Sequence, residues 1–374
     1  MVAVAGLSVS PTSTVLDVRD IKKGRLVGTI NLRRVPAAGL AAGEADVAQW
    51  VADAQTALAR AGVEDLAAIS VSAPLHALVA LDASGAAIRP ALLAEDQRSG
   101  PDAGWCTKKI PALDWSTSVG SVPSAALTVT KLSWLHRSEP DVWERIARLC
   151  SMGGVVAEAL CDSPTRCLTD RVTASGTGYW SATNNAYDDR VLALIDSERA
   201  WSGTLPDVGG SLDPVGTRGE AKVGVGTADL VAMAVALGAE TGDVIVSIAE
   251  RVIVYGLSDR AVIDESGTIS SFASLSGGFL PAVALPIETD EVSAGVIAAI
   301  RTMRNAGVPT GGRLFVCGPE HSVIDIALRC SRSEGSRVQV CTDDELAAIG
   351  ASRQAAAVLL GDWPSWQPVL TRRV

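Results

Sequence analysis

Histidine is scarce in this chain, and its cysteines are scattered. The 374 residues include only three histidines, His76, His136 and His321, which lie far apart in the sequence. Of the seven cysteines, the closest two are Cys161 and Cys167, and none form a C-x-x-C pair. Zinc sites and redox dithiols require close, regular spacings of these residues. The sequence therefore predicts no metal site, and its odd number of dispersed thiols predicts a reducing, cytoplasmic location.

An excess of positive charge and long apolar runs are also missing. The net charge is −10 and the pI is near 4.9. Nucleic acids and anionic membranes attract basic surfaces, so neither is expected as the main partner. Every apolar run is broken by a charge or a glycine before it reaches the length of a membrane span. The apolar start Val2–Val9 lacks the basic region and cleavage site of a signal peptide, and it predicts a first strand.

What remains is the composition of a large globular chain. Hydrophobic residues make up 48% of the sequence, enough for two domains with cores of their own. Alternation and helical spacing predict secondary structure throughout the first half. The predicted strands are Val2–Val9, Ser13–Val18, Arg25–Leu32 and Ala67–Ser72, and the predicted helices are Glu44–Ala61, Val129–Leu135, Val142–Cys150 and Asp188–Ser197.

A stretch rich in glycine and proline, Leu205–Gly219, predicts the domain boundary. We expect an N-terminal lobe at residues 1–215 and a C-terminal lobe at residues 216–374. Strands followed by alternating helices occur on both sides of it, which predicts an α/β protein of two related lobes around a cleft. The second half is predicted to contain strand Val244–Ile248, a hairpin of Val252–Leu257 with Ala261–Asp264, helix Val292–Asn305, strand Arg313–Val316, helix Val323–Arg329, strand Val338–Val340 and helix Asp344–Leu360.

The Gly-rich turn before Asp229 is the most informative local pattern. Asp229 stands at the start of an Ala-rich helix, and the next strand ends in the polar turn Ala249-Glu250-Arg251. Glycines let a ligand approach the backbone, and a carboxylate can take a proton from a hydroxyl, as in phosphoryl-transfer clefts. Two alternatives stay open. Asp229 can be a simple helix cap, and Glu250 can be either a solvated turn residue or an anion where a phosphate requires bare N–H groups.

Several segments resemble, in order, blocks of the FGGY family of carbohydrate kinases, and in particular bacterial xylulokinases. The resemblance implies the actin-like ATPase fold: two ribonuclease-H-like lobes around a central cleft, with sugar mainly on the first and ATP on the second. The second lobe is expected to be shortened, because the chain between Leu285 and Gly312 is much shorter than in full kinases. The segments that carry the resemblance are Ile69–Ser99, Val119–Leu135, Thr169–Trp180, Gly224–Gly238 and Ile349–Leu359.

On the sugar side, the resemblance assigns five positions. The family's Ser-Gly-Gln-Met-His segment reads Ser-Ala-Pro-Leu-His here, so Leu75 and His76 keep sugar-binding positions while the Gly-Gln pair is lost. The family's Trp-Asn-Asp-x-Arg block retains Asp96 and Arg98, and the catalytic base matches Asp229. The residues alone leave two other interpretations open: a structural histidine at position 76, and a surface ion pair of Asp96 with Arg98.

On the nucleotide side, the resemblance finds altered motifs. The first phosphate turn lacks its magnesium-organising Asp and has Ser8 in the matching segment. The family's Gly-Thr-Ser-Gly turn is replaced by Ala249, Glu250 and the two residues that follow, and its Gly-Gly-Gly-Ala motif by a segment that contains Gly318. These four residues are the expected cofactor-binding positions, in degenerate form. Mg-ATP is the expected cofactor if the protein is active, and none otherwise.

The resemblance thus implies a sugar kinase with damaged phosphate motifs. If active, the protein would phosphorylate a ketopentose such as xylulose from ATP, with Asp229 as the base. The alternative is a catalytically inactive pseudokinase that binds a sugar or serves as a scaffold. The expected partner is a small pentose or pentitol, and a homodimer stays open. An actin-like structural protein is a weaker third hypothesis, because the matched blocks belong to sugar kinases.

Overall fold

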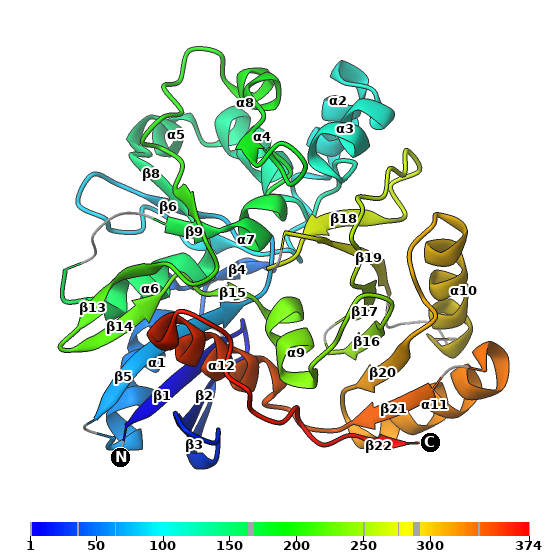
Figure 1. The fold of residues 1–374 in the computed structure, drawn as a ribbon. Helices are drawn as coiled ribbons and strands as arrows, with labels where there is room; N and C mark the ends of the chain where they lie inside the picture. Colours follow the sequence, from blue (N-terminus) through cyan, green and yellow to red (C-terminus); the bar gives the residue numbers. More distant parts are fainter. Residues whose placement is uncertain are drawn as a thin grey trace.

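Two β-sheets organise the chain, one in each half. The computed structural model describes residues 2–35, 37–63, 65–163, 168–249, 251–275, 277–286, 292–335 and 337–373. Figure 1 shows the two sheets on opposite sides of the molecule, with helices α9 (Asp229–Leu237) and α12 (Leu346–Leu360) between them.

The first sheet has the strand order β13-β14-β5-β1-β2-β3, and β15 also pairs with β5. Strands β1, β2 and β3 form an antiparallel meander, whereas β5 runs parallel to both β1 and β14. Helices α1 (Val47–Ala61) and α6 (Met152–Leu160) pack against this sheet and each other. The strands are β1 (Ala3–Val9), β2 (Ser13–Asp20), β3 (Leu26–Arg33), β5 (Leu66–Ala73), β13 (Pro214–Arg218), β14 (Ala221–Gly224) and β15 (Thr227–Ala228).

Helix α1 shows how the local sequence sets one of these elements. Its N-cap is Asp46, whose carboxylate accepts a hydrogen bond from the Ala48 N–H at 2.9 Å, and it ends at Gly62 in the left-handed conformation. The buried side chains between these ends, including Trp50 and Leu58, form one apolar stripe on the sheet.

The second sheet repeats the arrangement of the first, with the order β18-β19-β17-β16-β20-β21-β22. Its β16, β17 and β19 form an antiparallel meander, and β16 runs parallel to β20, which runs parallel to β21. Such a repeat is the ribonuclease-H-like arrangement of the actin-like fold. The elements are β16 (Val244–Ile248), β17 (Val252–Gly256), β18 (Ser270–Ala273), β19 (Phe279–Leu285), α10 (Val292–Asn305), β20 (Arg313–Cys317), α11 (Glu320–Glu334), β21 (Arg337–Cys341) and β22 (Arg372–Arg373).

Helix α12 packs unusually close to its neighbours because its buried face is built from small residues. It contacts α9, β1 and β5. A Cβ atom at Gly350 would stand 1.8 Å from the carbonyl oxygen of Ala232 in α9, a separation that no side chain can occupy. The hydroxyl of Ser352 donates to the buried carboxylate of Asp17 at 2.6 Å. This helix therefore fixes α9, and the residues at its start, against the first sheet.

A group of smaller elements covers one end of the first sheet and meets the second half there (Figure 1). The Ser271 N–H of β18 donates to the Gly120 carbonyl at 2.7 Å, and the Ala273 N–H donates to the Ser175 hydroxyl at 2.8 Å. The elements of this group are β4 (Glu44–Ala45), β6 (Val79–Leu81), β7 (Ala91–Leu92), α2 (Gly100–Lys109), α3 (Ala112–Val119), α4 (Thr128–Ser138), α5 (Pro140–Arg145), β8 (Arg148–Cys150), β9 (Leu168–Asp170), α7 (Arg171–Ser175), β10 (Trp180–Ser181), β11 (Ala186–Tyr187), α8 (Asp189–Ile195) and β12 (Asp207–Gly209).

Two predicted elements were wrong. The helix predicted at Val142–Cys150 ends at Arg145, because residues 148–150 pair with β6 as a strand. Residues 261–264 form no strand. The side chain of Asp264 instead accepts hydrogen bonds from the N–H groups of Ser266 and Ile269 and turns the chain.

The sequence also predicted a lobe boundary at residue 216. Residues 216–228 lie on the second-lobe side of that boundary, yet they supply most of β13 and all of β14 and β15 to the first sheet. They do so because β14 and β15 both pair in parallel with β5.

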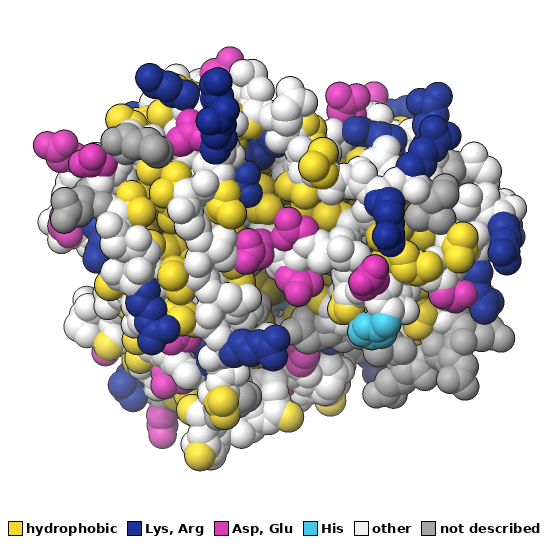
Figure 2. Space-filling model, turned by 90° about the horizontal axis from the view of Figure 1, so that it is seen from below, with side chains coloured by type: hydrophobic (Ala, Val, Ile, Leu, Met, Phe, Trp, Pro, Cys, Tyr) yellow, Lys and Arg dark blue, Asp and Glu magenta, His cyan; other side chains and the backbone are white. Residues whose placement is uncertain are grey.

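Charged residues of both signs share the surface. On the face seen in Figure 2, acidic and basic side chains are interspersed, with several acidic groups near the middle of the view. Across the described residues, no helix combines the length and apolarity needed to cross a membrane.

Candidate active site

The candidate site begins where two parallel strands end side by side. In the pairing of β15 with β5, Thr227 lies opposite Ser72 and Ala228 lies opposite Ala73. Asp229 and the Pro74-Leu75-His76 segment therefore leave the first sheet at one edge. Ligands of open α/β sheets bind at the carboxyl ends of strands, which is the edge in question here.

Asp229 is half-buried at the first position of α9. Its Oδ1 accepts a hydrogen bond from the Leu230 N–H at 2.7 Å, and the positive end of the helix dipole favours its negative charge. A residue from the second half of the chain also contacts the first turn of α9. The buried Tyr255 hydroxyl of β17 donates to the Leu230 carbonyl at 2.9 Å. Burial and the nearby carboxylate of Asp229 raise the pKa of Tyr255, so its hydroxyl stays protonated as a donor.

His76 has an uncommon backbone conformation, with φ of 74° in the left-handed region. Its Nδ1 lies 2.5 Å from the carbonyl oxygen of Gly176. A carbonyl only accepts, so Nδ1 must carry the proton and Nε2 is left as an acceptor. Burial lowers the pKa of His76 to about 4, and the charges of Lys131 and Arg251 contribute. The imidazole is therefore neutral near pH 7, and its ring lies 5.4 Å from that of Phe272 in β18.

Leu75 is buried and packs toward Gly176 at the end of α7. Its side chain belongs to the same apolar cluster as Val172 and Tyr179. The structure therefore gives the Leu75 side chain a packing role, and any contact with a ligand would come from its backbone.

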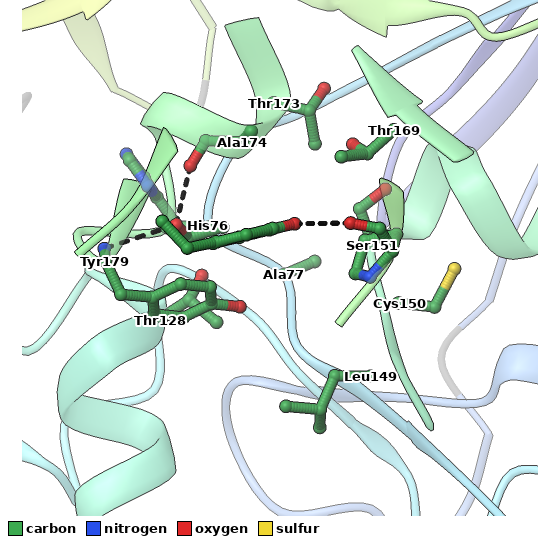
Figure 3. Close-up of a pocket in the computed structure, with 13 residues that line it drawn as sticks. His76, Ala77, Thr128, Leu149, Cys150, Ser151, Thr169, Thr173, Ala174 and Tyr179 are labelled. Carbon is green, nitrogen blue, oxygen red and sulfur yellow. Dashed lines mark hydrogen bonds between the residues drawn. The ribbon is translucent and has the colours of Figure 1, made fainter. Parts of the chain in front are cut away.

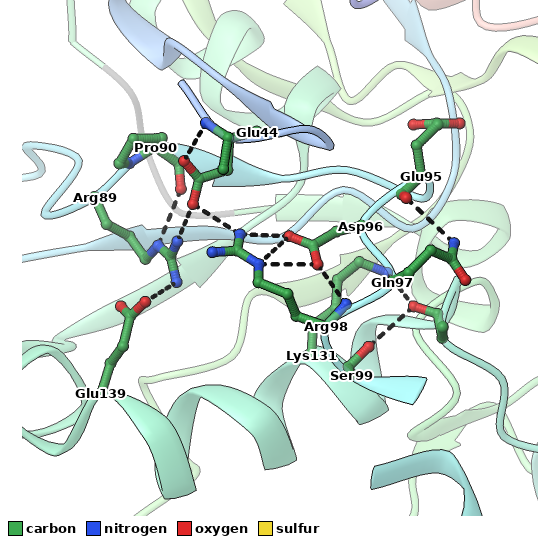
Figure 4. A network of polar contacts seen from close by, with 12 residues as sticks. Glu44, Arg89, Pro90, Glu95, Asp96, Gln97, Arg98, Ser99, Lys131 and Glu139 are labelled. Atoms are coloured by element: carbon green, nitrogen blue, oxygen red, sulfur yellow. Dashed lines mark hydrogen bonds and ion pairs between the residues drawn. The ribbon is translucent and has the colours of Figure 1, made fainter. Parts of the chain in front are cut away.

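Asp96 and Arg98 lie in a network of polar contacts that includes Glu44 (Figure 4). Arg98 Nε donates to both carboxylate oxygens of Asp96 at 3.0 and 3.1 Å, and its Nη2 reaches Glu44 at 2.7 Å. Burial opposes ionisation of Asp96, but the hydrogen bonds from Arg98 outweigh it and hold its pKa below the usual value. The Arg98 guanidinium lies 4.6 Å from the centre of the Trp134 ring. Asp96 is thus bonded to Arg98 rather than open to the cleft.

Lys131 was missed by sequence reasoning and lies buried in this region. Its Nζ donates to the carbonyl oxygens of Ala125, at 2.9 Å, and Ala126. Burial lowers the pKa of Lys131 to about 7, although the charges of Asp96 and Glu95 partly oppose the shift. The only signal in the sequence was a lysine between apolar residues of a predicted helix.

The two turns that the resemblance assigns to phosphate binding contain backbone N–H groups that donate within the turns themselves. Ser8 lies near the end of β1, opposite Ser72 of β5. In the turn that follows, the Ser10 hydroxyl oxygen accepts from the N–H groups of Thr12 and Ser13 at 3.3 and 3.0 Å. In the second turn, the Ala249 N–H donates to the Arg251 carbonyl at 3.0 Å. Glu250, one of the predicted cofactor-binding positions in degenerate form, lies outside the described residues.

Gly318 follows β20 and has φ of 146°. A Cβ atom here would stand 2.6 Å from the carbonyl oxygen of Ile248 in β16, so the close packing of the two strands by itself requires glycine. In the described part of the chain, no group of three or more His, Cys, Asp or Glu side chains is placed to hold a metal ion.

A small cavity of about 30 Å³ lies beside His76, and residues that carry hydroxyl groups, such as Thr128 and Ser151, are among those that line it (Figure 3). Such a volume has room for one or two water molecules, whereas small-ligand pockets measure roughly 300–1,000 Å³. Asp229, Asp96 and Arg98 do not line it. This cavity is therefore too small to be the sugar site.

Comparison with known proteins identifies the family. Residues 42–240 match the model of the FGGY family of carbohydrate kinases, N-terminal domain. The chain belongs to the FGGY family of carbohydrate kinases.

Curated relatives agree with this assignment. The chain is 34% identical to the xylulose kinase of Streptomyces coelicolor over 291 residues, which cover 74% of this chain and 59% of that protein. It is 28% identical to the xylulose kinase of Streptomyces rubiginosus over 435 aligned residues, which cover 97% of this chain and 89% of that protein. The second alignment is longer than the chain itself, so this relative carries residues that the FGGY protein described here lacks.

Solved structures of FGGY-type kinases have the same fold. The crystal structure of xylulose kinase from Bifidobacterium adolescentis superposes with a TM-score of 0.86 at 23% identity, covering 100% of this chain and 95% of that one. Ligand-bound xylulose kinase from Lactobacillus acidophilus gives a TM-score of 0.82 at 12% identity, with coverages of 97% and 90%. The predicted actin-like fold of two lobes is therefore confirmed.

Proposed function

We propose that this FGGY-family protein binds a pentose or pentitol in the cleft, with Asp229 as the base-equivalent residue. The observation that supports this most is the parallel pairing of Ala228 with Ala73, which brings Asp229 and His76 to one edge of the sheet. By resemblance, the family's catalytic base and its sugar-binding histidine match these two positions. An ionised carboxylate there can accept a proton from a primary hydroxyl of a ketopentose such as xylulose.

Sugar recognition is proposed to use the neutral imidazole and its surroundings. His76 Nε2 can accept a hydrogen bond from a sugar hydroxyl, while its Nδ1 stays bound to the Gly176 carbonyl. The Arg98 guanidinium is one-third exposed, and it can add a donor while it holds Asp96 in place. A lost family contact, such as that of the Gly-Gln pair, costs roughly 1 kcal/mol of binding free energy, so weak binding is expected to persist.

The residues at the phosphate turns do not fit Mg-ATP. Backbone N–H groups of Thr12, Ser13 and Ala249, which a phosphate would require, already donate within their own turns. Ser8 provides no carboxylate near magnesium. Phosphoryl transfer derives its rate from preorganised donors and neutralised charge, so each missing donor costs roughly a hundredfold or more. We therefore propose that ATP-dependent phosphorylation is weak or absent.

A coupled assay that detects ADP tests this proposal. Wild-type protein with xylulose and Mg-ATP is expected to give little turnover above the Asp229→Asn variant, which serves as the control for contaminating kinases. Robust turnover that disappears in Asp229→Asn would contradict the impaired nucleotide side and identify a working kinase.

A further inference from the structure

Arg251 crosses the cleft between the two halves of the chain. It directly precedes β17, next to the altered phosphate turn, and its side chain points to the first half. Its Nη2 donates to the Ala94 carbonyl at 3.4 Å, and its Nε lies 3.8 Å from a carboxylate oxygen of Glu95. The family's Gly-Thr-Ser-Gly turn has no cation at this place, so the residue is a feature of this chain.

These contacts leave most of the guanidinium available. A 3.4 Å hydrogen bond is longer than the usual range, and the ion pair with Glu95 is partly exposed, with side-chain exposures of 35% and 46%. The guanidinium has five N–H donors. One of these donors makes the single hydrogen bond that the guanidinium forms among the described residues. A better anion than Glu95 could therefore take its place without breaking the fold.

The surroundings of Arg251 favour an anion, although the whole chain carries a net charge of −10. The charges of Arg251 and Lys131 both lower the pKa of His76, and Arg251 lowers that of Lys131, so the three groups act on one region of the cleft. The acids there are partly used. Asp96 is held by Arg98 through two nitrogens, and among the described residues the acid paired with Arg251 is Glu95.

Strand β17 holds Arg251 and Asp229 in a fixed relation. Tyr255, four residues along from Arg251, is bonded to the first turn of α9, where Asp229 lies. The charge of Arg251 also acts on His76, so a ligand bound beside His76 can present a phosphate to the guanidinium.

We infer that Arg251 binds the phosphate of a sugar monophosphate in this cleft, and that the preferred ligand is a phosphorylated pentose or pentitol. The inference rests on the proposed sugar site. A phosphate monoester carries nearly two negative charges at neutral pH, and the planar guanidinium matches two of its oxygens. ATP requires a nest of backbone donors for several phosphates, whereas one sugar phosphate requires a single well-placed cation.

Calorimetry with xylulose, xylulose 5-phosphate and inorganic phosphate tests the inference. Wild-type protein is expected to bind the phosphate ester at least tenfold more tightly than xylulose, and inorganic phosphate much more weakly than the ester. Arg251→Met should reduce affinity for the ester at least tenfold and leave xylulose affinity unchanged. Glu95→Gln should act in the opposite direction and increase affinity for the ester. Arg260→Met is the matched control, because this exposed arginine pairs only with its neighbour Asp259 among the described residues.

The outcomes separate this inference from the proposed function. If wild-type protein binds xylulose, and binds the ester no more tightly than xylulose, the inference is overturned but the proposed sugar site is not. The same holds if Arg251→Met, folded as judged by its melting temperature, retains full affinity for the ester. Equal affinity for the ester and inorganic phosphate would also overturn it, since it indicates a bare anion site. Absence of binding by xylulose and its phosphate would refute both proposals.

Discussion

Replacing Gly226 with alanine is expected to separate the two halves of the candidate site. Gly226 has φ of 78°, and a Cβ atom there would stand 2.3 Å from the Val71 carbonyl oxygen in β5. The left-handed conformation alone costs an L-residue about 1–2 kcal/mol. The clash must in addition move the turn away from β5, which weakens the pairing of β15 and the 3.0 Å bond from Thr227 to Asp170. At about 1 kcal/mol for each lost hydrogen bond, the free energy of unfolding should fall by roughly 3–5 kcal/mol in total.

Gly219→Ala provides the matched control for this prediction. Gly219 also has a positive φ, 54°, but no atom lies within 4 Å of its would-be Cβ. Gly219→Ala should therefore lower the free energy of unfolding by only about 1–2 kcal/mol. Urea unfolding of both variants measures the free energies, and xylulose titration should show weakened binding in Gly226→Ala alone. If the two variants differ by less than about 1 kcal/mol, the close approach of the turn to β5 does not have the role assigned to it.

Two further predictions concern the groups around the cleft. Burial lowers the pKa of His76 from 6.5 to about 4, so the unfolded chain binds the proton more tightly than the folded one. The free energy of unfolding should therefore fall by up to about 3 kcal/mol as the pH falls from about 6.5 to 4. Urea unfolding at several pH values should show a smaller loss in His76→Gln, and equal slopes would contradict burial of the imidazole. Arg98→Lys removes the two-nitrogen contact with Asp96 and should lower the unfolding free energy by about 2 kcal/mol. The control Arg260→Lys should lower it by under about 0.5 kcal/mol. Similar losses in both variants would show that the network around Asp96 does not stabilise the fold.

Much of the architecture could be predicted from periodicity, because each half repeats strands whose apolar residues face a core. Boundaries of α10 and β16 match the predicted ones. The structure of the connector Leu205–Gly219 was harder to predict, because its glycines and prolines suggest a linker without strands. Pairing with the distant strand β9 nevertheless makes β12 from it, and a hairpin with β14 makes β13. Strand formation depends on such neighbours more than on local sequence.

The candidate site divides in the same way. The resemblance placed Asp229 and His76 in one site, and the structure puts both at one edge of the first sheet. Contacts made by residues far apart in the sequence had no local signal. The bond from Tyr255 to α9, the burial of Lys131 and the reach of Arg251 across the cleft are of this kind. They depend on how the two halves meet, which composition and spacing do not encode.

The central claim is that a carbohydrate site persists in this cleft, and calorimetric titration with pentoses and pentitols tests it most directly. Wild-type protein is expected to bind xylulose or a related pentitol. His76→Ala, which removes the Nε2 acceptor, should bind it about fivefold to tenfold more weakly. No heat from any pentose or pentitol in a folded sample, or equal binding by His76→Ala, would contradict the account.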